Sequence, residues 1–465
     1  MSSVTKATFS EKAGYGFGDM SSSMFWKIFS YYLPFFYSNV FGLSLAHAGT
    51  LLLITKLYDA VSDPVMGMIA DRTSTRWGRY RPYLLWGAIP FALAGVLTFT
   101  TPDASYAFKH VFAYVTYLIM MTAYTAINVP YGAMLGVMTP DSREKTVFSS
   151  YRMFFAYAGS FIALAIFEPL QKFFQNAGPG VTVADSWQYS MIVVGAICAI
   201  LFILCFAMTR ERVTPETTSA GNGGSSVMKD LKSLVTNVPW WILLGAAIGI
   251  LLFNSIRGGA AAYYFKDVVG TSAIFTCGIY LAIGEIANMI GVAAAVPMSD
   301  RLGKKTAYMV SLLVAAVLSL FIMFLPVSSS WGLWTLLGLQ ILISIATGVT
   351  LPLLWSMFAD IADYSEYKNS SASTGLIFSS SSMAQKFGGA FGSALILWVL
   401  AGYGYDTSET AVQTSVAVSG LKAMMSWIPA LGAFAAAAVV AFYPLTTSRM
   451  KEISAALASR RSGRD

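Results

Sequence analysis

Two carboxylates, Asp59 and Asp63, lie four residues apart in the otherwise apolar stretch LYDAVSDPVMG. On a helix, residues i and i+4 share a face, so both side chains point toward one place, and Lys56 lies one turn earlier. With the Ser62 hydroxyl they form an oxygen cage suited to a hard cation such as Na⁺. Alternatively the pair shares a proton, because two like charges in an apolar site repel each other. A buried ion pair with Lys56 or Lys386 that only fixes helix packing is the structural alternative.

Other polar side chains interrupt apolar segments, where a charge is expensive and therefore suggests function. Lys386 lies among serines and glycines in FSSSSMAQKFGGAFG and either loses its proton or needs a carboxylate partner, for which the aspartate pair is the candidate. Arg152, in VFSSYRMFFAYAG, is either an interface anchor or a hydrogen-bond fork for substrate hydroxyls or a carboxylate. Tyr124, Thr125 and Asn128 in YTAINVPYGAM add neutral donors and acceptors.

The elements that position these side chains are membrane-spanning helices. The chain has 465 residues, of which 56% are hydrophobic and 11% charged, whereas soluble domains carry about 25% charge. Apolar stretches of about 20 residues, enough to cross a ~30 Å hydrocarbon layer as a helix, recur along it. The predicted spans are 24–44, 47–70, 83–100, 108–138, 148–173, 187–208, 237–265, 272–297, 306–326, 331–356, 374–401 and 418–444. This pattern predicts an all-α membrane protein with twelve transmembrane helices.

The distribution of charge indicates orientation rather than nucleic-acid binding. The net charge is +7, and most Lys and Arg residues fall in segments that share one side of the bilayer if both termini are cytoplasmic. The segments on the opposite side carry few, such as Lys109, Lys172 and Lys266. With two histidines and three cysteines, the chain offers no convincing catalytic set, so we expect neither an enzyme nor a bound cofactor.

A long polar segment divides the chain in two. Residues 209–236, which include TRERVTPETTSAGNGGSSVMKD, follow the sixth predicted span and are rich in Ser, Thr and Gly. We therefore predict an N-terminal six-helix bundle over 1–208, a cytoplasmic loop over 209–236 and a C-terminal six-helix bundle over 237–444. Residues 445–465 form a cytoplasmic tail.

One loop motif occurs in both halves. GMIADRTSTRWGRYRP contains Asp71 and Arg72, and VPMSDRLGKKT contains Asp300 and Arg301. The repeat resembles the inner-loop signature of the major facilitator superfamily, whose two six-helix halves hold substrate near the midplane and expose it alternately to each side. We expect the Asp71 and Arg72 pair to latch helix ends at the inner face; topological anchoring alone is the alternative.

The resemblance narrows to the glycoside–pentoside–hexuronide:cation symporters, the melibiose permease group, and within it to the xyloside and glucuronide branch. It rests on LYDAVSDPVMG, NVPYGAMLGVMTPDSREK, ADIADYSEYKNSSAST and FYPLTTSRMKEI. The resemblance implies that Asp59, Asp63 and Thr125 bind the coupling cation, with Ser62 where melibiose permease has asparagine. The family's coupling lysine falls on Lys386, and Lys56 joins this charge network.

The sugar-binding positions match the family only in part. Arg152 and the aromatic Tyr124 agree by type, whereas the Lys–Asp pair of melibiose permease falls on Ser22 and Ser23 and its aspartate on Asn128. These departures argue against melibiose as the substrate. The residues expected to bind substrate are Arg152, Asn128, Tyr124, Asp19, Ser23 and Ser382. The residues expected to form the inner gate are Asp71, Arg72, Asp300, Arg301 and Asp363.

Together these features predict a symporter of the bacterial inner membrane that imports a glycoside, pentoside or hexuronide with H⁺ or Na⁺. The sequence leaves open a neutral or an acidic sugar, and H⁺, Na⁺ or Li⁺ as the coupling ion. We expect a monomer in the bilayer, with no nucleic-acid partner. The alternatives are a lysophospholipid-type lipid transporter on the same scaffold and a membrane sugar sensor that does not transport.

Overall fold

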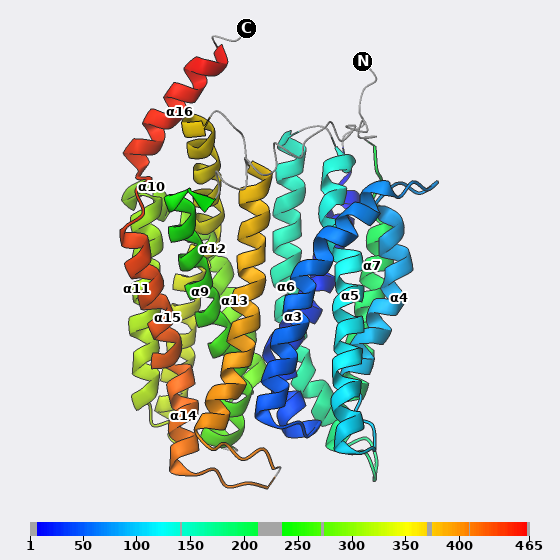
Figure 1. Cartoon of the computed structure of the whole chain (residues 1–465). Coiled ribbons are helices and arrows are strands. Elements are labelled where there is room, and N and C mark those ends of the chain that lie inside the picture. The colour runs from blue at the N-terminus through cyan, green and yellow to red at the C-terminus, as the bar shows by residue number, and fades with distance from the viewer. Residues whose placement is uncertain are drawn as a thin grey trace. The chain divides into compact units, whose positions relative to one another are not determined.

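The chain forms helices joined by turns and loops in the ranges that the computed structural model describes, which are residues 7–139, 142–212, 235–270, 274–369, 374–408 and 410–462. The first half contains α1 (Phe9–Tyr31), α2 (Leu33–Phe35), the π-helix η1 (Phe36–Val40), α3 (Leu45–Arg72), α4 (Arg81–Thr98), α5 (Tyr106–Met138), α6 (Ser142–Gln175) and α7 (Val183–Met208). The second half contains α9 (Val238–Tyr264), η2 (Phe265–Val269), α10 (Cys277–Leu302), α11 (Lys304–Phe321), η4 (Ile322–Phe324), α12 (Ser330–Asn369), α13 (Thr374–Gly402), α14 (Ser415–Met425), α15 (Trp427–Ala441) and α16 (Thr447–Ser462). Figure 1 shows these elements in chain order.

A helix lies at each predicted span, which confirms the all-helical membrane class. Within the described ranges, eight helices are long and apolar enough to cross a bilayer. The helices α1, α3, α4 and α13 are not among these eight. Charged residues explain this for α3, because Lys56, Asp59 and Asp63 lower its mean hydropathy. The count of twelve crossing helices therefore stays a prediction.

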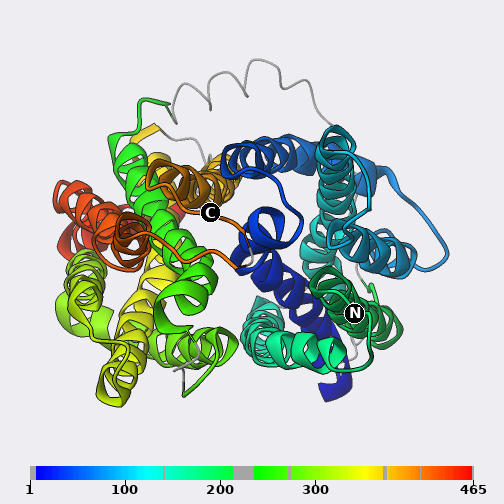
Figure 2. The same cartoon turned by 90° about the horizontal axis from the view of Figure 1, so that it is seen from below.

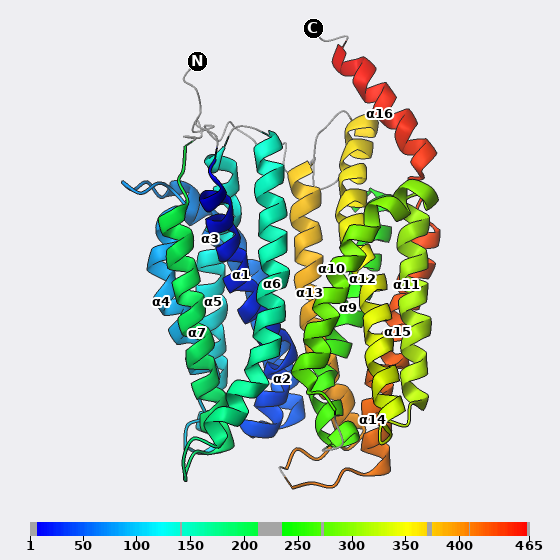
Figure 3. The same cartoon turned by 180° about the vertical axis from the view of Figure 1, so that it is seen from behind.

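The first compact unit comprises Met1–Thr217, Phe275–Ala282 and Leu397–Val412. Within it, α1 packs against α6 and α7, and α3 packs against α5. The helix α4 packs against both α5 and α7, and Figure 3 shows α1 running beside α6. The candidate residues on α1, α3, α5 and α6 therefore lie within one unit.

The second compact unit comprises Thr218–Ile274, Ile283–Ile396 and Gln413–Asp465. In this unit α9 packs against α12, α14 and α15, and α11 packs against α12 and α15. Figure 2 shows these helices from their ends. The candidate residue Lys386 belongs to this unit, on α13.

Small residues allow α1 to lie close to its neighbours. A Cβ added to Gly18 would lie 2.4 Å from the ring of Tyr131 on α5, and one added to Gly16 would lie 2.4 Å from the ring of Phe155 on α6. Both distances are far below van der Waals contact, so the two glycines provide the space that these aromatic rings occupy. Asp19 follows Gly18 directly, so the close packing fixes the position of its carboxylate.

Replacing Gly18 with alanine is expected to destabilise the protein by about 1–3 kcal/mol, because the added methyl group overpacks the contact with Tyr131. The matched control is Gly132→Ala on α5, where an added Cβ has no heavy atom within 4 Å. Thermal denaturation of the detergent-purified protein measures the difference. An unchanged midpoint for Gly18→Ala would show that α1 and α5 move apart at no cost.

The segment after α7 ties the ends of several helices together. The Glu211 carboxylate accepts hydrogen bonds at 2.8 Å from the backbone N–H groups of Arg79, Tyr80 and Arg81, at the start of α4. These groups have no partner within the helix, and the positive end of the helix dipole favours an anion there. The next residue, Arg212, donates two hydrogen bonds of 2.6 Å to the Glu11 carboxylate, which raises the pKa of its guanidinium.

Glu211→Gln is expected to destabilise the protein by about 1–3 kcal/mol, because an amide has one oxygen acceptor and its NH₂ group faces backbone donors. Glu452→Gln is the control, since Glu452 pairs with Arg449 on an exposed face of α16. The same thermal denaturation assay compares them. Equal midpoints in the two variants would mean that the contacts of Glu211 add nothing to stability.

Candidate functional site

The two aspartates of α3 converge on one hydroxyl group of α5. The Thr125 Oγ1 lies 2.9 Å from Asp59 Oδ1 and 3.0 Å from Asp63 Oδ1. Asp59 is buried, with 1% of its surface exposed, while Asp63 is half-buried. Ser62 lies at the edge of the group, 3.4 Å from Thr125 Oγ1. The structure therefore brings together the four residues for which the sequence predicts a cation site.

One hydroxyl hydrogen faces two carboxylates in this cluster. The Thr125 hydroxyl has a single hydrogen, so it can donate to only one of the two aspartates at a time. Ser62 donates its hydrogen to the backbone carbonyl of Asp59 at 3.1 Å. In the other contact, the Thr125 hydroxyl oxygen and the carboxylate oxygen both act as acceptors and repel each other. A proton or a cation bound between them would make this contact favourable. This geometry suits a site that takes up one positive charge.

An ion pair joins α1 to α6 in the same unit. Arg152 Nε donates to Asp19 Oδ2 at 2.8 Å, and the two side chains are 35% and 14% exposed. The guanidinium also lies 5.2 Å from the centre of the Tyr131 ring. Arg152 lies about one and a half turns inside the apolar segment Val147–Gln175 of α6, and its guanidinium pairs there with the carboxylate of Asp19.

Tyr124 directly precedes the cluster residue Thr125 on α5. Asn128, one turn further along α5, donates to the Tyr124 backbone carbonyl at 3.3 Å. Thr125 contacts the aspartates and Tyr131 contacts the Arg152 guanidinium, so α5 links the cation cluster to the ion pair within the first unit.

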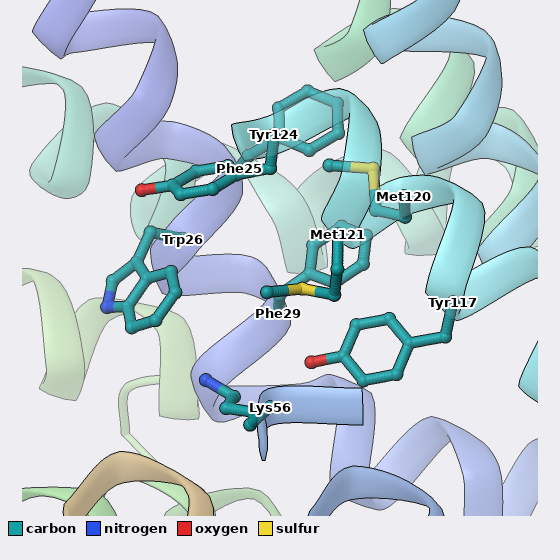
Figure 4. A pocket seen from close by; sticks show the side chains of 8 residues that line it. All are labelled: Phe25, Trp26, Phe29, Lys56, Tyr117, Met120, Met121 and Tyr124. Carbon is teal, nitrogen blue, oxygen red and sulfur yellow. The ribbon is translucent and has the colours of Figure 1, made fainter. Parts of the chain in front are cut away.

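An aromatic pocket adjoins this region. Trp26 and Tyr124 have ring centres 5.7 Å apart, and the ammonium group of Lys56 lies 4.0 Å from the centre of the Trp26 ring. Figure 4 shows Lys56 pointing toward Trp26. The residues that line the pocket are Phe25, Trp26, Phe29, Lys56, Tyr117, Met120, Met121 and Tyr124. The walls are mostly aromatic with one cationic group, and the space between them in this conformation is about that of one water molecule, too small for a sugar ring.

The sequence did not single out Trp26, although a signal for it was present. Trp26 follows Asp19 by seven residues, which places both on one face of α1. Ser23, one turn after Asp19, is half-buried on α1. The face of α1 that carries Asp19 therefore contributes an aromatic ring, that of Trp26, to the candidate site in addition to its polar side chains.

Two further predicted residues belong to the second unit. Lys386 is half-buried on α13, and the side chain of Ser382 lies outside the described residues. The pairing of Lys386 with the aspartates of α3 therefore stays a prediction.

The predicted inner-gate residues lie at helix ends. Arg72 is exposed at the end of α3, and the side chain of Asp71 lies outside the described residues. Asp300 and Arg301 are exposed near the end of α10, whereas Asp363 is half-buried on α12. The latch between Asp71 and Arg72 stays a prediction.

An ion pair that the sequence analysis missed lies beside the second copy of the motif. Lys304 Nζ donates to both carboxylate oxygens of Asp360, at 2.7 and 2.8 Å, and so joins the start of α11 to α12. The two residues are 56 positions apart, so no local pattern indicates their contact. In the sequence, Lys304 is one of the basic residues of the motif VPMSDRLGKKT.

Known proteins similar to this chain are membrane transporters. Residues 14–447 match the family described as MFS/sugar transport protein. A putative glycoside/cation symporter of Escherichia coli is 36% identical over 99% of this chain and 97% of its own length. An isoprimeverose transporter of Lactiplantibacillus pentosus is 32% identical over 93% and 88%. A glucuronide carrier protein homolog of Escherichia coli is 28% identical over 96% and 95%.

A solved structure supports the fold. The nucleoside transporter NupG aligns with a TM-score of 0.62 and 15% identity, over 94% of this chain and 100% of that one. At 15% identity, this similarity supports the fold and nothing more specific. The relatives named above are transporters, and the chain covers nearly all of each of them. The prediction that the chain is a transporter and not an enzyme is therefore confirmed.

Proposed function

The chain belongs to the sugar transport family of the major facilitator superfamily, and we propose that it is a symporter that imports a sugar together with H⁺ or Na⁺. We further propose that Asp59, Asp63, Ser62 and Thr125 are its cation site. The sugar binds beside this site, at Asp19, Arg152, Tyr124 and the Trp26 face. The protein acts in the bacterial inner membrane, with both termini in the cytoplasm.

The observation that carries this proposal is the contact of one hydroxyl with two carboxylates. Thr125 Oγ1 lies 2.9 and 3.0 Å from the oxygens of Asp59 and Asp63, and its single hydrogen serves only one of them. A bound proton or Na⁺ makes the other contact favourable. The site therefore has a physical reason to bind a cation.

Coupling follows if the bound cation changes the surroundings of the sugar. The helix α5 carries both Thr125, which contacts the aspartates, and Tyr131, which contacts the Arg152 guanidinium, so a positive charge at the cluster alters the field in which sugar hydroxyls bind. The ion and the sugar then each raise the affinity for the other, and by linkage the effect is reciprocal. Alternating access moves both across the membrane.

The test is counterflow and uptake in proteoliposomes, with a panel of glycosides, pentosides and hexuronides. Each sugar is measured with and without Na⁺ and at several pH values, and added lysophospholipid serves as a competitor. We expect at least one sugar to exchange and to accumulate against its gradient when a cation gradient is imposed. The absence of exchange for every sugar, or uptake of lysophospholipid in their place, would refute the proposal.

A further inference from the structure

A carboxylate of α6 holds the start of α10. Glu168 Oε1 accepts hydrogen bonds from the backbone N–H of Gly278 at 2.9 Å and from the Tyr32 hydroxyl at 3.1 Å. Gly278 is the second residue of α10, so its N–H has no partner within the helix, and the positive end of the helix dipole favours an anion there. Tyr32 is 2% exposed, and its ring contacts those of Phe167 and Trp187. The carboxylate therefore joins a firmly packed side chain to the first turn of α10.

The first turn of α10 also lies in backbone contact with α6. A Cβ added to Gly278 would lie 2.3 Å from the backbone oxygen of Leu164, far below van der Waals contact. Leu164 and Glu168 are four residues apart, so they share one face of α6. The same face of α6 therefore receives the helix start and supplies its hydrogen-bond acceptor. Cys277, the residue before Gly278, is 5% exposed in this arrangement.

A second hydrogen bond holds the chain just after α13. Asn39 of η1 donates from Nδ2 to the Tyr405 hydroxyl at 3.2 Å, and Tyr405 is 5% exposed. The segments Phe275–Ala282 and Leu397–Val412 belong to the first compact unit, whereas the rest of α10 and of α13 belongs to the second. Both helices therefore have one end that is attached to the first unit, close to these hydrogen bonds.

We propose that Glu168, Tyr32, Gly278, Asn39 and Tyr405 form an outer clamp, which must open and close in each transport cycle. The inference rests on the proposed function, because alternating access moves one six-helix bundle against the other. The helices α10 and α13 come from the second half of the chain, so their attachment to the first unit has to break when this side opens. With both termini in the cytoplasm, α6 runs outward and the clamp closes the outer side.

The native Cys277 thiol reports the state of the clamp, because it reacts with a maleimide only when it is exposed. The detergent-purified protein is treated with a maleimide, and the labelling of each cysteine is followed by mass spectrometry. In Glu168→Gln the acceptor loses its charge, so we expect Cys277 to react roughly tenfold faster than in the wild-type protein. Tyr32→Phe removes one donor and should give a smaller increase, of roughly threefold. Glu452→Gln, at an exposed position of α16, is the matched control and should keep the wild-type rate.

The other two cysteines show whether a variant is folded. Cys198 and Cys205 are fully buried on α7, so their reaction together with Cys277 would indicate unfolding. If Glu168→Gln unfolds, the comparison rests on the milder Tyr32→Phe. Equal Cys277 rates in the wild-type protein and in the folded variants would overturn the clamp.

Sugar counterflow of the fully labelled wild-type protein gives a second readout, which needs no clamp variant. A maleimide adduct on Cys277 keeps the clamp from closing, so exchange should fall by roughly half or more, because the cycle needs both sides to close in turn. Cys277→Ser, treated in the same way, should keep its exchange rate. Unchanged exchange by the labelled protein would show that the clamp is not part of the cycle. If the unlabelled protein exchanges no sugar, the proposed function is wrong, while the labelling rates still decide whether Glu168 holds α10.

Discussion

Asparagine at position 59 or 63 is expected to abolish cation-driven accumulation of sugar while exchange of sugar down its gradient continues. Asparagine is nearly the same size as aspartate but carries no charge, so the cluster around Thr125 no longer attracts a cation. A coupling energy of typical size predicts a loss of accumulation of roughly tenfold or more. Accumulation and counterflow in the same proteoliposomes measure the two activities separately.

The outcome of these variants distinguishes coupling from packing. Asp103→Asn removes a carboxylate at an exposed loop position and should leave both activities unchanged. If the Asp59 and Asp63 variants both lose folded protein, the pair serves helix packing, as the structural alternative holds. If accumulation persists in both variants, the cation binds elsewhere.

Thr125→Val sharpens the same experiment, because valine keeps the shape of threonine and removes the hydroxyl. Thr125 lies at hydrogen-bond distance from both carboxylates. We therefore expect weaker cation affinity, seen as a higher Na⁺ or H⁺ concentration needed for half-maximal uptake, with the maximal rate less affected. The same cation requirement in Thr125→Val as in wild type would show that the hydroxyl is not a ligand.

The aspartate cluster could be predicted from the sequence because three of its residues, Asp59, Ser62 and Asp63, are neighbours in the chain. Two carboxylates at i and i+4 on an apolar helix must share a face, and Ser62 lies between them. Thr125 is different: it lies 66 residues from Asp59, and only the family resemblance pointed to it. The structure adds the distances, and with them the single hydroxyl hydrogen that faces two carboxylates, which no sequence pattern expresses.

The ion pair of Asp19 and Arg152 shows what sequence analysis leaves out. The two residues are 133 positions apart, so their contact depends on how α1 packs against α6. That packing depends on glycines, which no hydropathy pattern marks as contact points. Glu211 is a similar case, because a polar residue after a helix gives no sign that it will bind the start of another helix. The helix α1 also begins at Phe9, well before the predicted span, which places Asp19 inside it.

Arg152→Gln is expected to weaken sugar binding by roughly 10- to 100-fold, since a hydrogen bond to a charged group contributes about 1.5–3 kcal/mol. The variant also leaves Asp19 without its guanidinium partner, so it should lower stability. Sugar affinity is measured by direct binding to the purified protein, and stability by thermal denaturation. Cation binding should survive, because Asp59, Asp63 and Thr125 are unchanged.

The double variant Asp19→Asn with Arg152→Gln separates these two effects. Removing both charges eliminates the stranded carboxylate, so stability should return toward that of the wild-type protein. Sugar affinity should stay low, because the donors that Arg152 offers to hydroxyls are still missing. If the double variant instead recovers affinity along with stability, Arg152 matters only as the packing partner of Asp19. In that case the hydroxyl groups of the sugar must be recognised by Tyr124 and the aromatic pocket.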